Sequence, residues 1–105
     1  MSSRPFLRGR IVRALYFART ESETNELTFS QVHRILDNWN LSTDPDVLES
    51  EIDYLADLGL VASRKIDERG KTTLVVKLTP QGVDVHEQTV EAPPGVQVVK
   101  LKGEA

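Results

Sequence analysis

Hydrophobic residues recur at helical spacing between residues 41 and 61, and both ends of the pattern carry a boundary signal. The predicted apolar face of this helix consists of Val47, Leu48, Ile52, Leu55 and Leu58. Asp44 is suited to cap the helix because its side chain can accept a hydrogen bond from a free backbone N–H, and Pro45 fits the first helical position. Gly59 is the expected C′ residue, and the following apolar residues begin an extended segment. We therefore predict a helix that leads directly into a strand.

Two further helices are predicted before this one. In residues 5–19 the apolar residues at helical spacing are Leu7, Ile11, Leu15 and Ala18. A polar loop over residues 20–26 and an extended piece at residues 27–29 lead to a second helix, residues 31–39, which Ser30 is expected to cap. Its apolar stripe consists of Val32, Ile35, Leu36 and Trp39. Together with the helix described above, it forms a helix-turn-helix pattern.

The chain continues with the pattern of a β-hairpin. Two strand-like runs, residues 60–66 and 72–79, flank a polar turn that contains Gly70. The apolar residues that alternate along the second run, and so predict one buried face, are Leu74, Val76 and Leu78. A last helix over residues 81–90 is expected to follow, with Thr79 as its N-cap.

Length and composition indicate one domain with one core, because the chain has 105 residues and 39% hydrophobic content. We assign residues 1–90 to this domain and residues 91–105 to a tail that is either extended or disordered. The tail contains a strand-like run, residues 96–102, which either pairs with another segment or stays free. No apolar run is long enough for a signal peptide or a membrane span, so we expect a cytoplasmic protein that does not interact with membranes.

Candidate catalytic and metal-binding residues are scarce. The absence of cysteine rules out disulfides and thiolate metal sites. His33 and His86 lie on different predicted helices and make a poor set of metal ligands, so His86 is expected to face solvent. No Gly-rich phosphate loop is present, and no pattern indicates a pocket around paired carboxylates. We therefore expect a non-enzymatic protein with no catalytic residue, cofactor or metal site.

The predicted order of helix, short strand, helix, helix, two-stranded wing and C-terminal helix is that of an α+β winged helix-turn-helix domain. Residues 55–61, Leu-Ala-Asp-Leu-Gly-Leu-Val, and residues 78–82, Leu-Thr-Pro-Gln-Gly, resemble the MarR/ArsR-type winged-helix signature. In that family a helix ends in Leu-x-x-x-Gly-Leu-Val and the wing ends in Leu-Thr-x-x-Gly. The resemblance covers residues 6–90, and it implies a DNA-binding fold that is often dimeric through its terminal helices. The whole chain is also similar to small winged-helix proteins encoded by Mu-like prophages.

The charge pattern differs from what a DNA-reading helix requires. The third predicted helix carries six acids and no Lys or Arg: Asp44, Asp46, Glu49, Glu51, Asp53 and Asp57. Glu49, Asp53 and Asp57 are spaced by four residues and form what we call the acidic stripe, which the DNA phosphates would repel. Positive charge lies elsewhere, because residues 1–20 contain five Arg and no acid. The segment of the predicted wing contributes Arg64, Lys65, Arg69, Lys71 and Lys77.

Three interpretations follow from this pattern. In the leading one, a transcription regulator binds double-stranded DNA with its wing and first helix, through Arg8, Arg10, Arg13, Arg64, Lys65, Arg69 and Lys71. In the second, a protein–protein adaptor of the phage or prophage type binds a basic partner through Asp46, Glu49, Asp53, Tyr54 and Asp57. In the third, both charged faces are only solvated, and their opposite charges help two copies to pack. We expect a homodimer through the first and last helices.

Overall fold

The computed structural model describes residues 4–21 and 25–98. Its elements are α1 (Arg4–Glu21), β1 (Glu26–Thr28), α2 (Phe29–Asn38), α3 (Pro45–Asp57), β2 (Val61–Glu68), β3 (Lys71–Leu78) and α4 (Pro80–His86). The three strands form one antiparallel sheet in the order β1-β3-β2. This arrangement confirms the predicted α+β winged helix-turn-helix fold, in which β2 and β3 form the wing.

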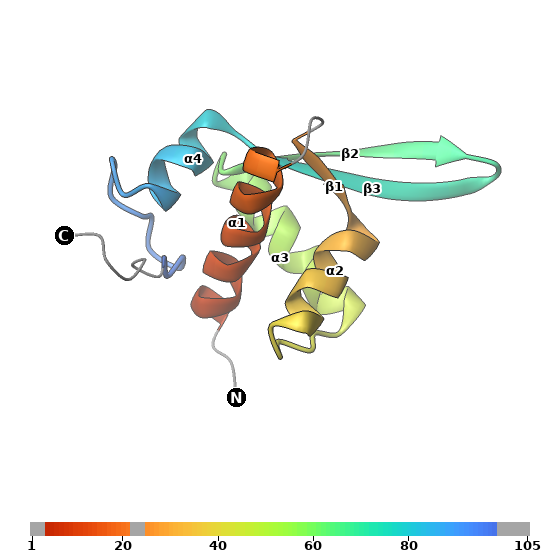
Figure 1. The fold of residues 1–105 in the computed structure, drawn as a ribbon, viewed down its shortest axis with the longest axis horizontal. Helices are drawn as coiled ribbons and strands as arrows, with labels where there is room; N and C mark the ends of the chain where they lie inside the picture. Colours follow the sequence, from red (N-terminus) through yellow and green to blue (C-terminus); the bar gives the residue numbers. More distant parts are fainter. Residues whose placement is uncertain (1–3, 22–24, 99–105) are drawn as a thin grey trace.

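The wing projects from a body made of the helices, and α1, α2 and α3 lie below the sheet in Figure 1. Its register runs from Val61 opposite Leu78 at the base to Glu68 opposite Lys71 at the tip. The helices and the sheet bury a common core whose fully buried members include Ile11, Leu15, Leu36, Leu48, Ile52, Leu55, Leu60 and Val76. The apolar faces predicted for the first three helices therefore lie in this core or pack against it.

The predicted ends of α3 and the predicted start of α4 are confirmed. Asp44 caps α3, because its Oδ1 accepts a hydrogen bond of 2.9 Å from the N–H of Asp46, and Pro45 is the first helical residue. Gly59 follows the helix with a φ of +79°, and Thr79 caps α4 through its side chain. These ends could be predicted because each depends on residues within one helical turn.

The start of α2 differs from the prediction, because Thr28 caps this helix and Ser30 lies inside it. The Thr28 hydroxyl accepts a hydrogen bond of 3.2 Å from the N–H of Gln31. In return, the Gln31 side-chain oxygen accepts a bond of 2.9 Å from the N–H of Thr28. This reciprocal pair satisfies two backbone donors, and the helix accordingly begins at Phe29.

The wing is longer than the sequence pattern predicts, because both strands continue into the polar segment between them. Only Arg69 and Gly70 form the turn, and both have positive φ values of +51° and +82°. Two central residues with positive φ are typical of a type I′ turn, whose twist matches that of the flanking strands. The turn therefore places Arg69 at the very tip of the wing.

The last helix is shorter than predicted, because α4 ends at His86 and Val90 is 46% exposed. Gln88 has a φ of +62°, and the N–H of Thr89 donates to the Asp84 carbonyl at 3.0 Å, which closes the helix end. His86 is also placed differently from the prediction. It is only 5% exposed, and its ring lies 4.2 Å from the Tyr16 ring, so it packs between α4 and α1 instead of facing solvent.

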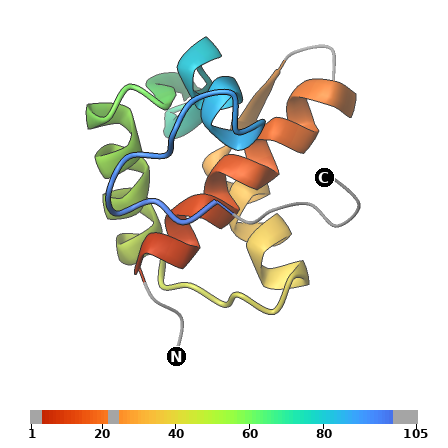
Figure 2. The same ribbon diagram turned by 90° about the vertical axis from the view of Figure 1, so that its left-hand side faces the viewer.

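After α4 the chain turns back and crosses α1, as Figure 2 shows. Val96 on this segment is buried in the common core. In the described part of the tail, residues 91–98, no residue belongs to a strand. The rest of the strand-like run, residues 99–102, lies outside the described residues.

The contact between α4 and the start of β2 depends on Gly82, and we expect its replacement by alanine to destabilise the domain. A Cβ at this position would overlap the carbonyl oxygen of Leu60 and press on the Leu78 side chain. We expect Gly82→Ala to cost about 1–3 kcal/mol, because overpacking outweighs the better helix propensity of alanine. Thermal unfolding followed by circular dichroism measures the effect, and a melting temperature equal to that of the wild type would contradict it.

Candidate nucleic-acid interface

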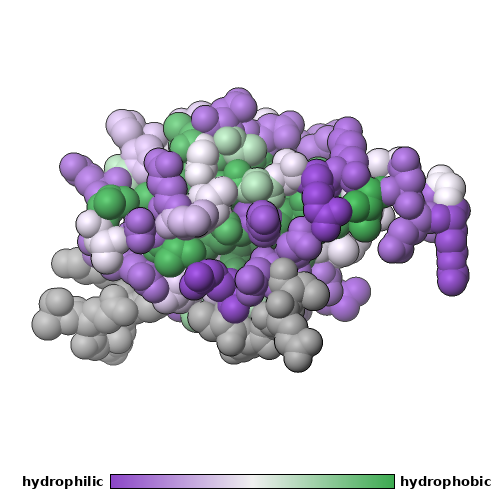
Figure 3. Space-filling model, turned by 90° about the horizontal axis from the view of Figure 1, so that it is seen from above, coloured by the Kyte–Doolittle hydropathy of each residue, from purple (hydrophilic) through white to green (hydrophobic). Residues whose placement is uncertain are grey.

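The tip of the wing carries exposed positive charge. Arg69 and Lys71 are both exposed, and neither forms an ion pair with any residue in the described part of the chain. Seen from above, the outer part of the wing is mostly hydrophilic and extends beyond the body of the molecule (Figure 3). The tip of the hairpin therefore presents two exposed cations, with the exposed acid Glu68 opposite Lys71 in the register.

The other two predicted wing residues lie on opposite faces of the hairpin, because successive side chains of a strand alternate. Arg64 is paired with Glu26 of β1, with 3.1 Å between Nη2 and Oε1, and this acid offsets its charge. Lys65 lies opposite Leu74 in the register and faces α3. Arg69 and Lys71 thus differ from Arg64 and Lys65, because they lie at the tip of the wing and form no ion pair within the described residues.

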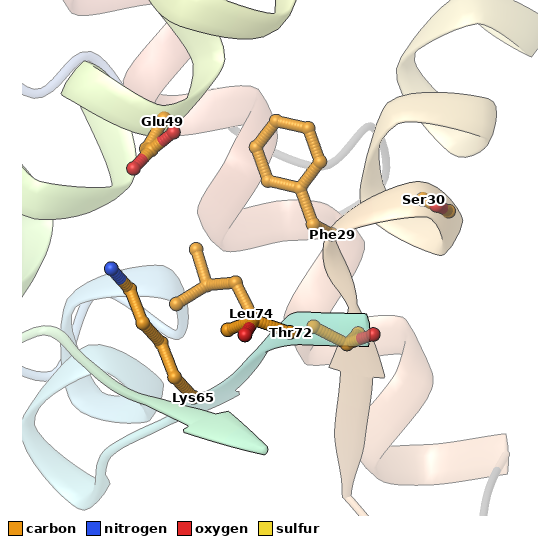
Figure 4. Close-up of a pocket in the computed structure, with 7 residues that line it drawn as sticks. Phe29, Ser30, Glu49, Lys65, Thr72 and Leu74 are labelled. Carbon is orange, nitrogen blue, oxygen red and sulfur yellow. The ribbon is translucent and has the colours of Figure 1, made fainter. Parts of the chain in front are cut away.

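Lys65 lines a groove of about 320 Å³ between the wing, α2 and α3. The residues around this groove are Phe29, Ser30, Glu49, Lys65, Thr72, Thr73 and Leu74. Figure 4 shows the Lys65 ammonium group and the Glu49 carboxylate pointing into the same gap. A phosphate that approached Lys65 here would therefore meet the negative charge of Glu49 at the same time.

The acidic stripe lies on the surface of α3, where Glu49, Asp53 and Asp57 are all exposed. Asp46 is also exposed, in the first turn of the helix. Glu51 differs from the other acids, because it is 1% exposed and faces α1. Its carboxylate accepts hydrogen bonds from Arg4, at 2.7 Å, and from Arg8. One of the six acids of this helix is therefore neutralised inside the domain.

The wing tip projects away from α1, which lies within the body of the molecule (Figure 1). Arg8 is largely enclosed, with its guanidinium carbon 3.7 Å from the centre of the Tyr54 ring. Tyr54 is thus half-buried under Arg8 rather than freely exposed. Arg10 lies over the Phe6 ring and Arg13 over the Phe17 ring, at 4.8 and 5.1 Å.

Two arginines near the charged surfaces are absent from the set that the sequence predicts. Arg34 on α2 is exposed and lines a groove with His33, Asp37 and Pro45, close to the start of α3. The sequence could have indicated that Arg34 is exposed, because this residue lies opposite the apolar stripe of α2. Arg4 contributes to the Glu51 ion pair, which depends on the packing of α1 against α3 and has no local sequence signal.

Within residues 4–21 and 25–98, no group of three or more His, Asp or Glu side chains is arranged to hold a metal ion. His33 instead pairs through its Nε2 with the Thr43 carbonyl oxygen at 2.8 Å. None of the described helices is long and apolar enough to cross a membrane.

The elements and their order define the chain as a winged helix-turn-helix domain. The crystal structure of Bacillus subtilis PadR in complex with operator DNA has the same fold, with a TM-score of 0.60. The match covers 91% of this chain and 53% of the PadR chain, so this chain spans about half the length of that protein. At 19% sequence identity the likeness shows the fold alone. No protein-family model and no curated protein sequence matches the chain.

Proposed function

We propose that this chain is a non-enzymatic, cytoplasmic DNA-binding protein that regulates transcription and contacts duplex DNA mainly with its wing. The observation that carries the proposal is the pair of exposed cations, Arg69 and Lys71, at the tip of a projecting hairpin. The fold supports it, because a winged-helix domain of similar structure occurs in PadR bound to operator DNA. Phosphate contacts supply most of the affinity of such proteins, and exposed Lys and Arg side chains make them.

In this binding mode α3 contributes little, since its acidic stripe would face the phosphates that flank the major groove. Arg69 and Lys71 would contact phosphates or the minor groove, where Arg side chains are favoured. Arg10 and Arg13 remain candidates for contacts with a second DNA segment. We leave Arg8 out of the proposed contact set because its side chain is bonded to Glu51. The homodimer through α1 and α4 and the relation to MarR/ArsR-type or prophage proteins remain predictions.

The double variant Arg69→Ala/Lys71→Ala tests the wing. We expect the slope of log affinity against log salt to become shallower by about 1.8, at about 0.9 for each phosphate that the variant no longer neutralises. The measurement is a salt titration of binding to a random-sequence duplex, starting at low ionic strength. The variant Arg19→Ala/Lys77→Ala is the control, because it removes two exposed cations away from the tip. Equal slopes for wild type and wing variant would refute the mechanism, and a wild type that does not bind DNA would refute the function.

A second candidate function is a protein–protein adaptor of the phage or prophage type. The observation that favours it is that Glu49, Asp53 and Asp57 are exposed along one face of α3, without an ion-pair partner among the described residues. A surface with three like charges in a row favours encounter with a basic partner and disfavours encounter with DNA. Reversing the charge of these three residues separates the two functions, since it should strengthen DNA binding and abolish binding to a basic partner.

A further inference from the structure

Residues 93–98, which we call the strap, bind to α1 by backbone contacts. The strap begins with a turn in which the N–H of Val96 donates to the Pro93 carbonyl at 3.2 Å and Gly95 has a φ of +91°. The N–H of Gln97 then donates to the carbonyl oxygen of Pro5 in the first turn of α1, at 2.9 Å. Val96 is buried in the core between these two points. The strap is thus an integral part of the packed domain.

Gly9 makes this close approach possible. A Cβ at this position would overlap the carbonyl oxygen of Gln97 and would lie 2.7 Å from its carbonyl carbon, so it would clash with the strap backbone. Gly9 is in the middle of α1, where alanine would favour the helix more than glycine does. The close approach of the strap backbone, and not the stability of the helix, therefore explains why residue 9 is glycine.

Arg8 joins the strap to α3. Its Nη1 donates to the Gly95 carbonyl oxygen of the strap at 3.0 Å, while its Nε donates to the Glu51 carboxylate of α3. Its guanidinium group also stacks on the Tyr54 ring, one turn further along α3. One side chain of α1 is therefore fixed by the strap on one side and by two residues of α3 on the other.

Glu51 depends on Arg8 for its neutralisation. Its side chain is almost fully buried, and its other partner, Arg4, is 53% exposed and therefore weakly held. Loss of one partner of a buried ion pair strongly destabilises the fold, because the remaining charge stays buried without compensation. A change in Arg8 is thus expected to move α3, and α3 continues through Gly59 and Leu60 directly into the wing.

We propose that Arg8 is a positioning residue for α3 and the wing, and that the strap holds it in that role. This inference rests on the proposed DNA-binding function. Displacement of the strap removes the Gly95 carbonyl from Arg8, loosens the bond to Glu51 and lets α3 and the base of the wing shift together. The strap thereby controls the affinity of the DNA-binding surface on the wing.

The variants Gly9→Ala and Glu51→Gln test this proposal in the full chain. Gly9→Ala displaces the strap without changing charge, and Glu51→Gln weakens the bond to Arg8 at a position that DNA cannot reach. We expect each variant to lower the affinity for a random-sequence duplex about three- to tenfold. Removal of a negative charge would by itself raise DNA affinity. A lower DNA affinity of Glu51→Gln would therefore not be an electrostatic effect.

Two control variants accompany them. Asp84→Asn makes the same charge change at an exposed position of α4, and Gln97→Ala changes an exposed side chain of the strap while keeping its backbone bonds. We expect both to bind DNA at least as well as the wild type. Unchanged or increased affinity in Gly9→Ala and Glu51→Gln would overturn the proposal.

Amide hydrogen exchange tests the positioning role of Arg8 independently of DNA binding. We expect protection of α3 amides to fall at least tenfold in Gly9→Ala and Glu51→Gln and to stay unchanged in Gln97→Ala. If the wild type does not bind DNA, the proposed function fails, while a loss of α3 protection would still support the positioning role. Unchanged α3 protection in both variants would overturn that role whatever the DNA result.

Discussion

Replacing Glu49, Asp53 and Asp57 with lysine is expected to raise the affinity for random-sequence duplex DNA roughly 10- to 100-fold at low ionic strength. The substitution changes the charge of the acidic stripe from −3 to +3 on the exposed face of α3. If each lysine neutralises one phosphate, the slope of log affinity against log salt becomes steeper by about 2.7. The effect exceeds that of the wing variant because it removes repulsion and adds contacts at the same time.

The control reverses three exposed acids at the α4 end, Asp84, Glu87 and Glu91, and makes the same change in net charge, although it also removes the hydrogen bond of 2.7 Å that Glu87 accepts from the Tyr16 hydroxyl. We expect a small gain in affinity for this control, because α4 lies at the opposite end of the molecule from the wing tip (Figure 1). Equal gains in both variants would show that net charge, and not the face of α3, governs binding. If the chain is an adaptor, the α3 variant should instead lose its basic protein partner.

The sequence predicted most of the fold because its signals are local. Asp44, Pro45 and Gly59 mark the ends of α3 through hydrogen bonds and backbone conformations that involve one helical turn. The alternation in β3 likewise depends only on the strand itself. The predicted ends of the wing strands and of α4 were less accurate, because turn type and helix termination also depend on how the segments pack.

The start of α2 shows how a usable local signal can be misjudged. Ser30 and Thr28 are both suitable N-cap residues, but only Thr28 has a glutamine three positions later, Gln31, that can complete the reciprocal pair. The sequence contained this spacing, and a comparison of the two candidates for it would have identified the correct cap.

The exposure and pairing of the charged residues of the candidate site could be predicted in part. The exposure of the acidic stripe follows from helical spacing, because Glu49, Asp53 and Asp57 lie opposite the apolar face. The inward position of Glu51 also had a signal, since it lies three residues after Leu48 and four before Leu55, within the buried face. Its pairing with Arg8 had none, because that contact brings together residues 43 positions apart.

The largest expected effect on stability comes from Leu55→Ala. Leu55 is fully buried in the core, and its carbonyl accepts the hydrogen bond of 3.0 Å from Leu60 that closes the end of α3. We expect a loss of about 2–5 kcal/mol, from the transfer of the side chain and the cavity that it leaves. For a domain of this size, that loss lowers the melting temperature by roughly 10–30 °C.

Val47→Ala is the matched control on the same helix, because Val47 is only half-buried and its truncation should cost about 1 kcal/mol or less. Chemical and thermal unfolding followed by circular dichroism compare the two variants, and equal losses would place Leu55 outside the core. Leu55 touches neither the wing tip nor the acidic stripe, so the fraction of Leu55→Ala that stays folded should bind DNA with the wild-type salt slope. A changed slope in that folded fraction would mean that core packing under α3 also sets the position of the charged surfaces.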